Sequence, residues 1–328
     1  MILSVIIPVF NAEDFIQKSY ASIIGQHIED IEILYIDNNS TDGSVIKINN
    51  LIEKDSRITL LHQLKKGAAP TRNKGLQHAS GKYIYLFDVD DEIFPNALKD
   101  MLEALESNEA VDAVFGKMIK SNKSISETPK PNDETFKLTI EERPYWGLKW
   151  LSDLSSVVGP PAFLYRASVF NQIGHYNEAL RIGQDTALDI RLGMLCHVAF
   201  LDRYVYLYFK HEESTIQKVK KKMPRAFMVW PRLVQEHLSF YLQQDVPLRF
   251  KTLLFAQIYQ AMARQIVFTS GLAKRSKLKG QLLSEIKSID VPFSIRFYLG
   301  ILVVLPFEPL RKIYGYHIVP AEIKKLKV

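Results

Sequence analysis

The chain has 328 residues, 47% hydrophobic and 24% charged, which is the composition of an ordinary globular protein with room for one large domain and a smaller one. Its single cysteine, Cys196, excludes an internal disulfide framework and fits a reducing cytoplasm. The net charge of +6 is unevenly distributed: residues 216–328 carry 20 Lys+Arg against 6 Asp+Glu, whereas residues 1–215 carry 22 against 30. The basic character therefore belongs to the C-terminal third.

The apolar residues 3–10 predict a first strand rather than a signal peptide, because no basic leader or cleavage signature accompanies them. Further strands are predicted at 31–36, 57–62, 83–87 and 111–115, and helices at 12–25, 44–53, 69–79 and 95–107. Strands that alternate with helices of this length are typical of a doubly wound, mostly parallel sheet. We therefore predict the α/β class.

Three aspartates, Asp88, Asp90 and Asp91, follow the apolar strand 83–87 at the edge of the predicted sheet. The carboxyl ends of strands in an open α/β sheet are where ligands bind. Carboxylates crowded there repel one another unless a cation or strong donors offset the repulsion, and carboxylate oxygens suit Mg2+ or Mn2+. The alternative is a solvated acidic turn that caps the helix beginning near Pro95.

Two common phosphate-binding signatures are absent from the sequence. No glycine precedes Gly25, so the Gly-rich turn that follows the first strand of dinucleotide-binding enzymes is missing. No Gly-x4-Gly-Lys-Ser/Thr run is found either. The sequence therefore excludes both kinds of phosphate-binding loop.

After residue 216 the pattern changes to a basic, mainly helical region that opens with the run 218–222. Helices are predicted near 224–243, 247–269 and 277–288. The uncharged segment 297–307 is shorter than the ~20 apolar residues that span a bilayer. Because basic residues flank it, we predict that it lies on an anionic membrane surface, the alternative being burial against the rest of the chain or a second subunit. Basic charge alone does not indicate nucleic acid, and no nucleic-acid partner is predicted.

Eight short pieces stand in the order and spacing of a known enzyme family. They are SVIIPVFN at 4–11, DNNSTDGS at 37–44, GAAPTRNKG at 67–75, DVDD at 88–91, LYR at 164–166, GHYNE at 174–178, GQD at 183–185 and HEESTI at 211–216. Together they resemble the inverting family-2 glycosyltransferases of GT-A fold, over residues 2–217. No single piece is specific, but eight in register identify the family.

The resemblance implies a metal-dependent enzyme that moves a hexosyl or N-acetylhexosaminyl group, with inversion, from a nucleoside-diphosphate sugar (UDP-sugar favoured) to a hydroxyl of a glycan or lipid-linked oligosaccharide. It implies a catalytic domain at 1–216, divided into a nucleotide-sugar-binding half (1–116) and an acceptor and base half (117–216), before the basic region 217–328. With the basic tail, it indicates bacterial polysaccharide or lipooligosaccharide synthesis in the cytoplasm, at the inner membrane face, and a homo-oligomer. The alternative is a non-catalytic nucleotide-sugar-binding or scaffold protein of the same fold.

The resemblance also implies the residues that bind the nucleotide sugar. They are Pro8, Phe10, Asn11, Asp37, Asn38, Arg72, Asp88, Val89 and Asp90. Pro8 and Asn11 have alternative roles as a strand terminator and a helix N-cap. Many family members have Asp at the position of Asn38, and the neutral amide leaves the identity of the base open. Asp42 and Ser44 are predicted to cap the next helix rather than to contact the ligand.

Charged side chains are expected around the diphosphate. Arg72 suits it because a guanidinium forms paired, charge-assisted hydrogen bonds with phosphate oxygens, the alternative being a surface arginine. The resemblance implies that Asp90 and Asp91 bracket Mn2+ or Mg2+, which stabilises the leaving diphosphate. It implies a place for Asp88 near the ribose or the metal, and for His211 as a further metal or phosphate contact, the alternative being a structural surface histidine.

Asp185 stands where similar enzymes have the catalytic base, which deprotonates the acceptor hydroxyl as it attacks the anomeric carbon. Relatives usually have a second acid just before it, whereas this chain has Gln184, so no adjacent charge raises the pKa of Asp185. The alternative is a helix N-cap.

Between the two sets of motifs, residues 121–139 are predicted to form a mobile loop. The aromatic residues at 145–150 either stack on an acceptor sugar or pack against the sheet, and packing is the favoured interpretation.

Overall fold

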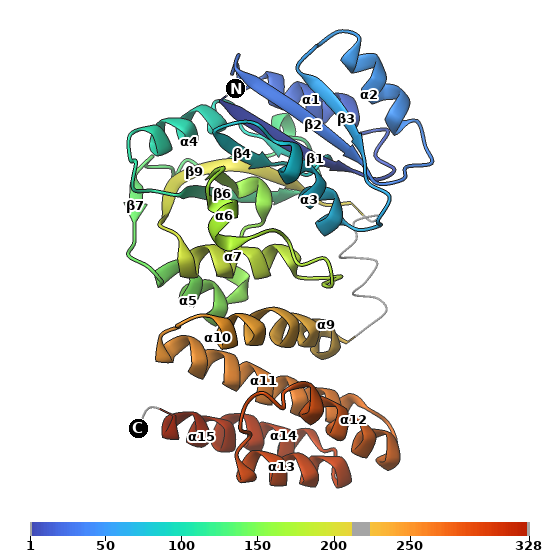
Figure 1. Cartoon of the computed structure of the whole chain (residues 1–328), viewed down its shortest axis with the longest axis vertical. Coiled ribbons are helices and arrows are strands. Elements are labelled where there is room, and N and C mark those ends of the chain that lie inside the picture. The colour runs from blue at the N-terminus through green and yellow to red at the C-terminus, as the bar shows by residue number, and fades with distance from the viewer. Residues whose placement is uncertain (1, 212–223, 327–328) are drawn as a thin grey trace. The chain divides into compact units, whose positions relative to one another are not determined.

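The computed structural model describes residues 2–211 and 224–326, which belong to two compact units, residues 1–214 and residues 215–328 (Figure 1). The boundary predicted between residues 216 and 217, the basic run 218–222 and the last part of the 211–216 motif lie outside the described residues.

The N-terminal unit is built on one nine-stranded sheet with helices on both of its sides (Figure 1). The strands are β1 (Leu3–Val9), β2 (Ile31–Asp37), β3 (Ile58–His62), β4 (Tyr83–Leu86), β5 (Glu92–Ile93), β6 (Ala113–Ser121), β7 (Leu138–Ile140), β8 (Phe163–Arg166) and β9 (Val198–Phe209). Their order is β3-β2-β1-β4-β8-β6-β9-β5, and β7 pairs with β9. Strands β1 to β4 run parallel, and β8 is antiparallel to both β4 and β6. The predicted α/β class is confirmed.

The helices of this unit fill the connections between strands. They are α1 (Ile16–Ile24), α2 (Ser44–Ile52), α3 (Ala68–His78), α4 (Ala97–Glu106), α5 (Tyr145–Ser152), α6 (Val169–Ile173) and α7 (Gln184–Leu195), with 3-10 turns at Ile125–Glu127, Leu154–Ser156 and Pro160–Ala162. Helix α3 packs on β1 and β2. A Cβ added at Gly75 would lie 2.3 Å from Cγ2 of Ile6, so only glycine allows α3 to come this close to the sheet.

Some boundaries differ from the prediction for identifiable reasons. Helix α1 begins at Ile16 rather than Ala12, because Asn11 has a positive φ of 48° and the N–H groups of Ala12 and Glu13 bond to side chains of the next loop. Strand β6 continues past Phe115 to Ser121, through an irregularity in its pairing with β9. It therefore runs across the predicted division between residues 116 and 117. Strands β5, β7, β8 and β9 were not predicted.

The described part of the C-terminal unit consists of helices. They are α9 (Arg225–Arg232), the π-helical turn η4 (Leu233–Leu238), α10 (Ser239–Gln243), α11 (Leu248–Phe268), α12 (Leu272–Glu285), α13 (Phe293–Val304), α14 (Glu308–Ile313), the π-helical turn η5 (Tyr314–Ile318) and α15 (Val319–Lys325). Helix α11 is the centre of this unit and contacts α9, α12, α13 and α15. The predicted helical region is confirmed. Among the helices that the structure describes, none is both long enough and apolar enough to cross a bilayer.

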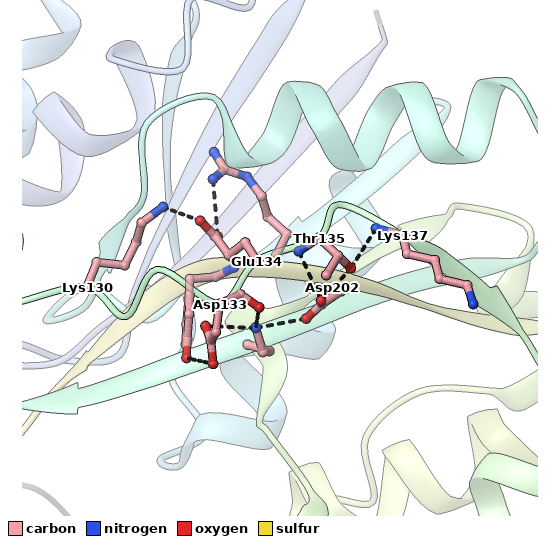
Figure 2. Close-up of polar contacts among 9 residues, drawn as sticks. Lys130, Asp133, Glu134, Thr135, Lys137 and Asp202 are labelled. Carbon is pink, nitrogen blue, oxygen red and sulfur yellow. Dashed lines mark hydrogen bonds and ion pairs between the residues drawn. The ribbon is translucent and has the colours of Figure 1, made fainter.

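The segment 121–139, predicted to be a mobile loop, is tied to strand β9 by hydrogen bonds from Thr135, near the C-terminal end of the segment (Figure 2). One carboxylate oxygen of Asp202 on β9 accepts hydrogen bonds from the backbone N–H of Thr135 at 3.0 Å and from its hydroxyl at 2.6 Å. The ammonium of Lys117 on β6 lies 2.8 Å from the other oxygen of Asp202. Asp202 therefore joins the segment to two neighbouring strands.

Glu134, an acid within segment 121–139, makes further contacts with β9 (Figure 2). Its carboxylate accepts a hydrogen bond from the backbone N–H of Tyr204 at 2.6 Å and pairs with Lys130 and Arg203. Arg203 also lies 2.6 Å from Asp100 of α4. Segment 121–139 is thus fastened to the sheet, and through Arg203 to a helix that packs on it.

Removing the Asp202 charge should destabilise this attachment in a pH-dependent way. Hydrogen bonds from Lys117 and Thr135 lower the pKa of Asp202 to about 2, so its stabilising effect is complete above the ordinary value of 3.8 and is lost as the pH falls toward 2. We expect Asp202→Asn to lower the free energy of unfolding by about 1 kcal/mol at neutral pH, and the difference from wild type to vanish near pH 2. Denaturant titrations at the two pH values measure this.

The matched control is Asp133→Asn, because Asp133 also pairs with Lys117 but its side chain is 61% exposed, against 21% for Asp202. An exposed ion pair contributes little, so this variant should unfold like the wild type. Equal destabilisation by both substitutions would contradict the role given to Asp202.

Candidate functional site

The candidate site lies at the carboxyl ends of β1, β2 and β4. Strand β1 stands between β2 and β4, so the connections that leave these parallel strands diverge at this edge of the sheet. Open α/β sheets bind ligands at such an edge. The loops that follow these three strands contain most of the residues predicted from the sequence.

The acidic turn after β4 is closed by its own backbone and anchored to the end of β9. The N–H of Asp91 donates to the carbonyl of Asp88 at 3.1 Å, and the N–H of Phe209 donates to the Asp91 carboxylate at 2.9 Å. The other carboxylate oxygen of Asp91 is buried and has no hydrogen-bond partner among the described residues. Burial, followed by the charges of Asp88 and Asp90, raises the pKa of Asp91 well above its usual range. One oxygen of Asp91 therefore remains for a proton or a cation.

The guanidinium of Arg72 joins this turn to helix α7. Its Nη2 donates to Asp88 at 2.6 Å, and its Nη1 donates to Asp185 at 2.8 Å. Its side chain is 6% exposed and lies over the ring of Tyr176, with 5.4 Å between the guanidinium carbon and the ring centroid. Burial favours a lower pKa, but the charges of Asp185 and Asp88 outweigh it and raise the pKa of Arg72 well above its usual range. Arg72 is thus a buried cation held between two carboxylates, and not a surface arginine.

Asp185 lies in the first turn of α7, after Gly183, which has a positive φ of 74°. A glycine adopts that conformation without strain, which allows the chain to turn into the helix directly before the acid. The Asp185 side chain is 39% exposed, so a ligand can reach it. Its pKa is raised, because desolvation outweighs the opposing charge of Arg72. A carboxylate that is accessible, fixed on one side by a cation and more basic than usual is suited to accept a proton.

Three further polar groups lie buried behind Asp185: the hydroxyls of Tyr165 and Tyr176 and one oxygen of Asp189, each without a hydrogen-bond partner among the described residues. Asp189 stands one helical turn after Asp185 and is 1% exposed. Burial and the charge of Asp185 raise the pKa of Asp189 well above its usual range.

Asp37 and Asn38 at the end of β2 are used to build the loops around them. The Asp37 carboxylate accepts from the N–H groups of Asn39 and Ser40 at 3.2 and 3.1 Å. The Asn38 amide donates to the carbonyls of Gln63 and Lys65, and its oxygen accepts from the N–H of Gly67 at 2.8 Å. Both amide hydrogens of Asn38 are therefore occupied, and only one lone pair of its oxygen remains for a ligand.

The residues at the end of β1 divide into a structural and an exposed group. The side-chain oxygen Oδ1 of Asn11 accepts from the N–H of Thr41 at 2.8 Å, which ties this loop to the loop after β2. Asn11 is not the N-cap of α1, which is Phe15. Pro8 sits in β1 beyond the stretch that pairs with β4, where a missing N–H costs no bond to that strand. Phe10 is 57% exposed at the end of the strand.

Asp42 and Ser44 flank the N-cap of α2, which is Gly43 and neither of the two residues predicted to cap the helix. The Asp42 carboxylate accepts from the N–H of Ser44 at 3.0 Å, at the start of α2, and from the N–H of Glu13 at 3.0 Å. The hydroxyl of Ser44 accepts from the N–H of Ala12 at 2.9 Å. These two side chains therefore join the first two loops of the site.

His211 lies beside the acidic turn. Its Nε2 is 2.8 Å from Oδ2 of Asp90, and its ring packs against Phe15 and Phe209 with centroid separations of 5.5 and 5.9 Å. Burial and the charge of Asp88 raise the pKa of Asp90, and His211 opposes this rise. The imidazole is thus held in place at the site by two rings and one carboxylate.

The donors around the acidic turn supply at most part of the ligands of a metal ion. Within residues 2–211 and 224–326, no three His, Cys, Asp or Glu side chains converge into a group that would hold a metal ion by themselves. Asp90 and His211 nevertheless place a carboxylate and an imidazole side by side. The Asp90 carboxylate is a ligand of the kind that Mg2+ or Mn2+ takes, with the remaining ligands supplied by phosphate oxygens and water, whereas the imidazole of His211 is a less usual ligand for these ions.

The aromatic residues of α5 belong to the core of the unit. Trp146 and Trp150 are buried, and both contact the ring of Phe115 on β6, with centroid separations of 4.8 and 5.3 Å. The favoured interpretation, packing against the sheet, is therefore correct for these two residues. Tyr145 is exposed.

The structure therefore brings Arg72, Asp88 and Asp185 into direct contact, and Asp90 into contact with His211. Val89 lies half-buried in the same acidic turn. Sequence reasoning missed the importance of Asn73, whose amide donates to the carbonyl of Tyr176 and accepts from its N–H at 2.9 Å. It also missed Asp189, although the spacing of four residues from Asp185 on one helix was visible.

The sequence matches a known family over most of the N-terminal unit. Residues 4–174, more than half of the chain, match the family model described as glycosyl transferase family 2. An uncharacterized glycosyltransferase of Haemophilus influenzae is 39% identical over 111 residues, which cover 34% of this chain and 44% of that protein. A GalNAc(5)-diNAcBac-PP-undecaprenol beta-1,3-glucosyltransferase of Campylobacter jejuni is 37% identical over 116 residues, 35% of this chain and 37% of that protein. The matched stretch thus spans less than half of either relative.

Two solved structures have a similar fold. Staphylococcus aureus TarS 1-349 in complex with UDP-GlcNAc superposes with a TM-score of 0.68 at 18% identity, covering 99% of this chain and 92% of that one. The mannosyltransferase PcManGT of Pyrobaculum calidifontis, in complex with GDP-Man and Mn2+, gives a TM-score of 0.52 at 16% identity, covering 99% and 85%. These similarities confirm the predicted GT-A-like fold, and the family match confirms the predicted glycosyltransferase class. The chain belongs to glycosyl transferase family 2.

Proposed function

We propose that this protein is a metal-dependent, inverting glycosyltransferase that moves a sugar from a nucleoside-diphosphate sugar to a hydroxyl of a glycan or lipid-linked acceptor, with Asp185 as the general base. One observation carries the proposal: the Arg72 guanidinium contacts both Asp88 of the acidic turn and Asp185 of α7. The side chains assigned to the donor and to the acceptor hydroxyl therefore border one reaction centre.

The donor end of the site is assigned to the loops after β1, β2 and β4. Phe10 offers an exposed ring on which a base stacks, and the loops that contain Asp37 and Asn38 border the base and ribose. A UDP-sugar is the favoured donor, and the similar fold of a protein in complex with UDP-GlcNAc supports it. Because the second structure is a complex with GDP-Man, GDP-sugars are included among the donors to be assayed.

The divalent ion is assigned to Asp90, Asp91 and His211, and the similar fold of a protein with GDP-Man and Mn2+ supports this assignment. When bound, Mn2+ or Mg2+ would neutralise the charge that develops on the departing diphosphate. The ion would also stabilise the acidic turn, because burial and the neighbouring negative charges raise the pKa values of Asp90 and Asp91.

Asp185 is assigned the proton transfer. The acceptor oxygen forms a bond to the anomeric carbon on the face opposite the diphosphate, and its proton passes to the Asp185 carboxylate. The bond between the anomeric carbon and the diphosphate oxygen breaks, and its electron pair leaves on the diphosphate. One carboxylate suffices for this step, because the departing diphosphate would be stabilised by the divalent ion and would need no proton from a second acid.

Arg72 acts in this scheme as a positioning residue. Each of its terminal nitrogens donates one hydrogen to a carboxylate and keeps a second N–H, which we assign to an oxygen of the diphosphate. Its planar fork holds Asp88 and Asp185 at fixed positions, and its charge keeps Asp185 ionised in a desolvated setting.

Asp185→Asn tests the general base. Asparagine keeps the shape but cannot accept the proton, so transfer should fall about 10²–10⁴-fold while donor binding is kept. Release of nucleoside diphosphate from a panel of UDP-, dTDP- and GDP-sugars, with mixed saccharide acceptors, measures the rate. The exposed Asp14→Asn is the control with the same change in charge. Equal rates for wild type and Asp185→Asn would contradict the base role, and no release by the wild type from any donor would favour the non-catalytic alternative.

Removing the charge of Arg72 tests its link to Asp185. The carboxylate must be deprotonated to act as a base, so activity falls as the pH drops through its pKa, and Arg72 holds that pKa down. In Arg72→Met the acid limb of the kcat profile should therefore move to higher pH. In Arg72→Lys, which keeps a charge but cannot span both carboxylates, kcat should fall with a smaller shift of the limb. Thermal unfolding of each variant is the control for folding, and an unchanged acid limb in a folded Arg72→Met would overturn this link.

Metal removal tests the third part of the proposal. Chelation with EDTA should abolish diphosphate release, and Mn2+ or Mg2+ should restore it. His211→Ala should raise the metal concentration for half-maximal activity by about tenfold or more. His78→Ala, an exposed histidine on α3, is the matched control and should behave like the wild type. Full activity in EDTA would exclude metal dependence.

A further inference from the structure

Helix α13 is apolar on two of its sides, and only one of them is covered. Ile295, Leu299, Leu302 and Val303 are buried, where α13 packs on α11 and α12. A helix of a globular protein normally shows polar residues on the face that it turns away from the core. Here that face is also apolar, which needs an explanation.

The uncovered face of α13 forms a shallow surface depression. It is lined by Lys279, Arg296, Phe297, Ile301, Val304 and Leu305, which we call the α13 patch. Phe297 is 54% exposed and Val304 is 61% exposed. Phe293, one turn before Phe297, stacks on it with 6.0 Å between ring centroids and is 81% exposed. Large aromatic and aliphatic side chains that gather on one surface in this way mark an interaction site.

Cations frame the α13 patch. Lys279 of α12 reaches over α13, since its ammonium lies 3.2 Å from the position of a Cβ at Gly300. Helix α12 carries Lys274, Arg275, Lys277 and Lys279 against one acid, Glu285. Arg296 lies 3.8 Å from Asp290, whose side chain is 99% exposed, so this single acid on a solvated pair offsets little of the charge. The patch thus combines exposed rings with positive charge.

This combination selects one kind of partner. The rings of the patch would suit an apolar protein surface, but its cations would not. The cations would suit a nucleic acid, but the aliphatic side chains would not. An anionic bilayer surface matches both, because apolar side chains enter the acyl boundary while Lys and Arg reach the headgroup phosphates. The described helices do not include one that could cross the bilayer, so the contact would be made by a helix lying on the surface.

We propose that the α13 patch, together with Phe293, docks the protein on an anionic lipid bilayer, with Phe293 and Phe297 in the acyl boundary and Lys279 and Arg296 at the headgroups. The inference rests on the C-terminal unit alone and does not depend on the glycosyltransferase assignment. It would place the protein on the surface where a lipid-linked acceptor is found.

Co-flotation of the full chain with vesicles tests the proposal. The protein should float with vesicles of phosphatidylcholine and phosphatidylglycerol at low salt, float less at high salt, and stay unbound with phosphatidylcholine alone. Lys279→Gln and Arg296→Gln should each weaken vesicle affinity about fivefold, the effect expected for one cation near an anionic surface. Lys54→Gln, an exposed lysine of the N-terminal unit, should leave the affinity unchanged.

The aromatic part of the proposal has its own variants. The double substitution Phe293→Ser and Phe297→Ser should abolish flotation without lowering the thermal unfolding temperature, because both side chains are exposed. Ile46→Ser is the control, an apolar residue of α2 with 66% exposure. Absence of flotation by the wild type, or equal flotation by the double variant, would overturn the proposal. The proposal would also be overturned if light scattering showed that the wild type is a dimer and the double variant a monomer, since the patch would then bind a second copy of the chain.

Discussion

The ion pairs of Arg72 with Asp88 and Asp185 are the interaction on which the candidate site depends. A buried guanidinium is costly unless its charge is matched, and here two carboxylates from distant parts of the chain match it. Without the cation, Asp88 and Asp185 would repel each other at an edge of the sheet that already holds Asp90 and Asp91. The aromatic ring of Tyr176 beneath Arg72 and the bonds from Asn73 to the backbone of Tyr176 hold this arrangement from the side of α3.

The distribution of charge in the chain has a bearing on how such a site would bind its ligand. Residues 1–215 carry a net charge of −8, so the unit with the site has no long-range attraction for an anionic diphosphate. Binding would therefore rely on local groups: the helix N-termini and backbone N–H groups at the sheet edge, and a divalent ion at the acidic turn. The surplus of positive charge lies in the other unit, where it frames an apolar face instead.

The elements that could be predicted from the sequence are those with continuous apolar runs or clear helical spacing. Strands β1, β2 and β4 and helices α2 and α3 lie within a residue or two of their predicted positions. Strand β9 was missed because Asp202 and Arg203 divide its apolar run and charged residues follow its end. The extension of β6 was missed because Gly116 and Lys117 interrupt its apolar pattern. The meeting of the acidic turn and α7 followed from family motifs. The burial of Arg72 between two acids did not, since spacing along a chain does not fix the path of a side chain.

The polar side chains at the ends of β1 and β2 were harder to interpret than the acids of the turn after β4. Asn11, Asp37 and Asn38 were predicted from the motifs to touch the nucleotide, and the structure shows each of them bonded to neighbouring loops. Nothing in the sequence distinguishes an amide that binds a ligand from one that binds a backbone carbonyl, because both need the same donors and acceptors.

The bonds of Asn38 also constrain how the nucleotide preference of such a protein can change over generations. Replacing this amide by the aspartate that many family members have would set a carboxylate against the carbonyl oxygens of Gln63 and Lys65, where two donors now stand. The connection between β3 and α3, which includes Gly67, would have to adopt another conformation to accommodate an acid at residue 38. Residue 38 and the loop 63–67 are therefore coupled, and an acid at residue 38 requires a different conformation of that loop.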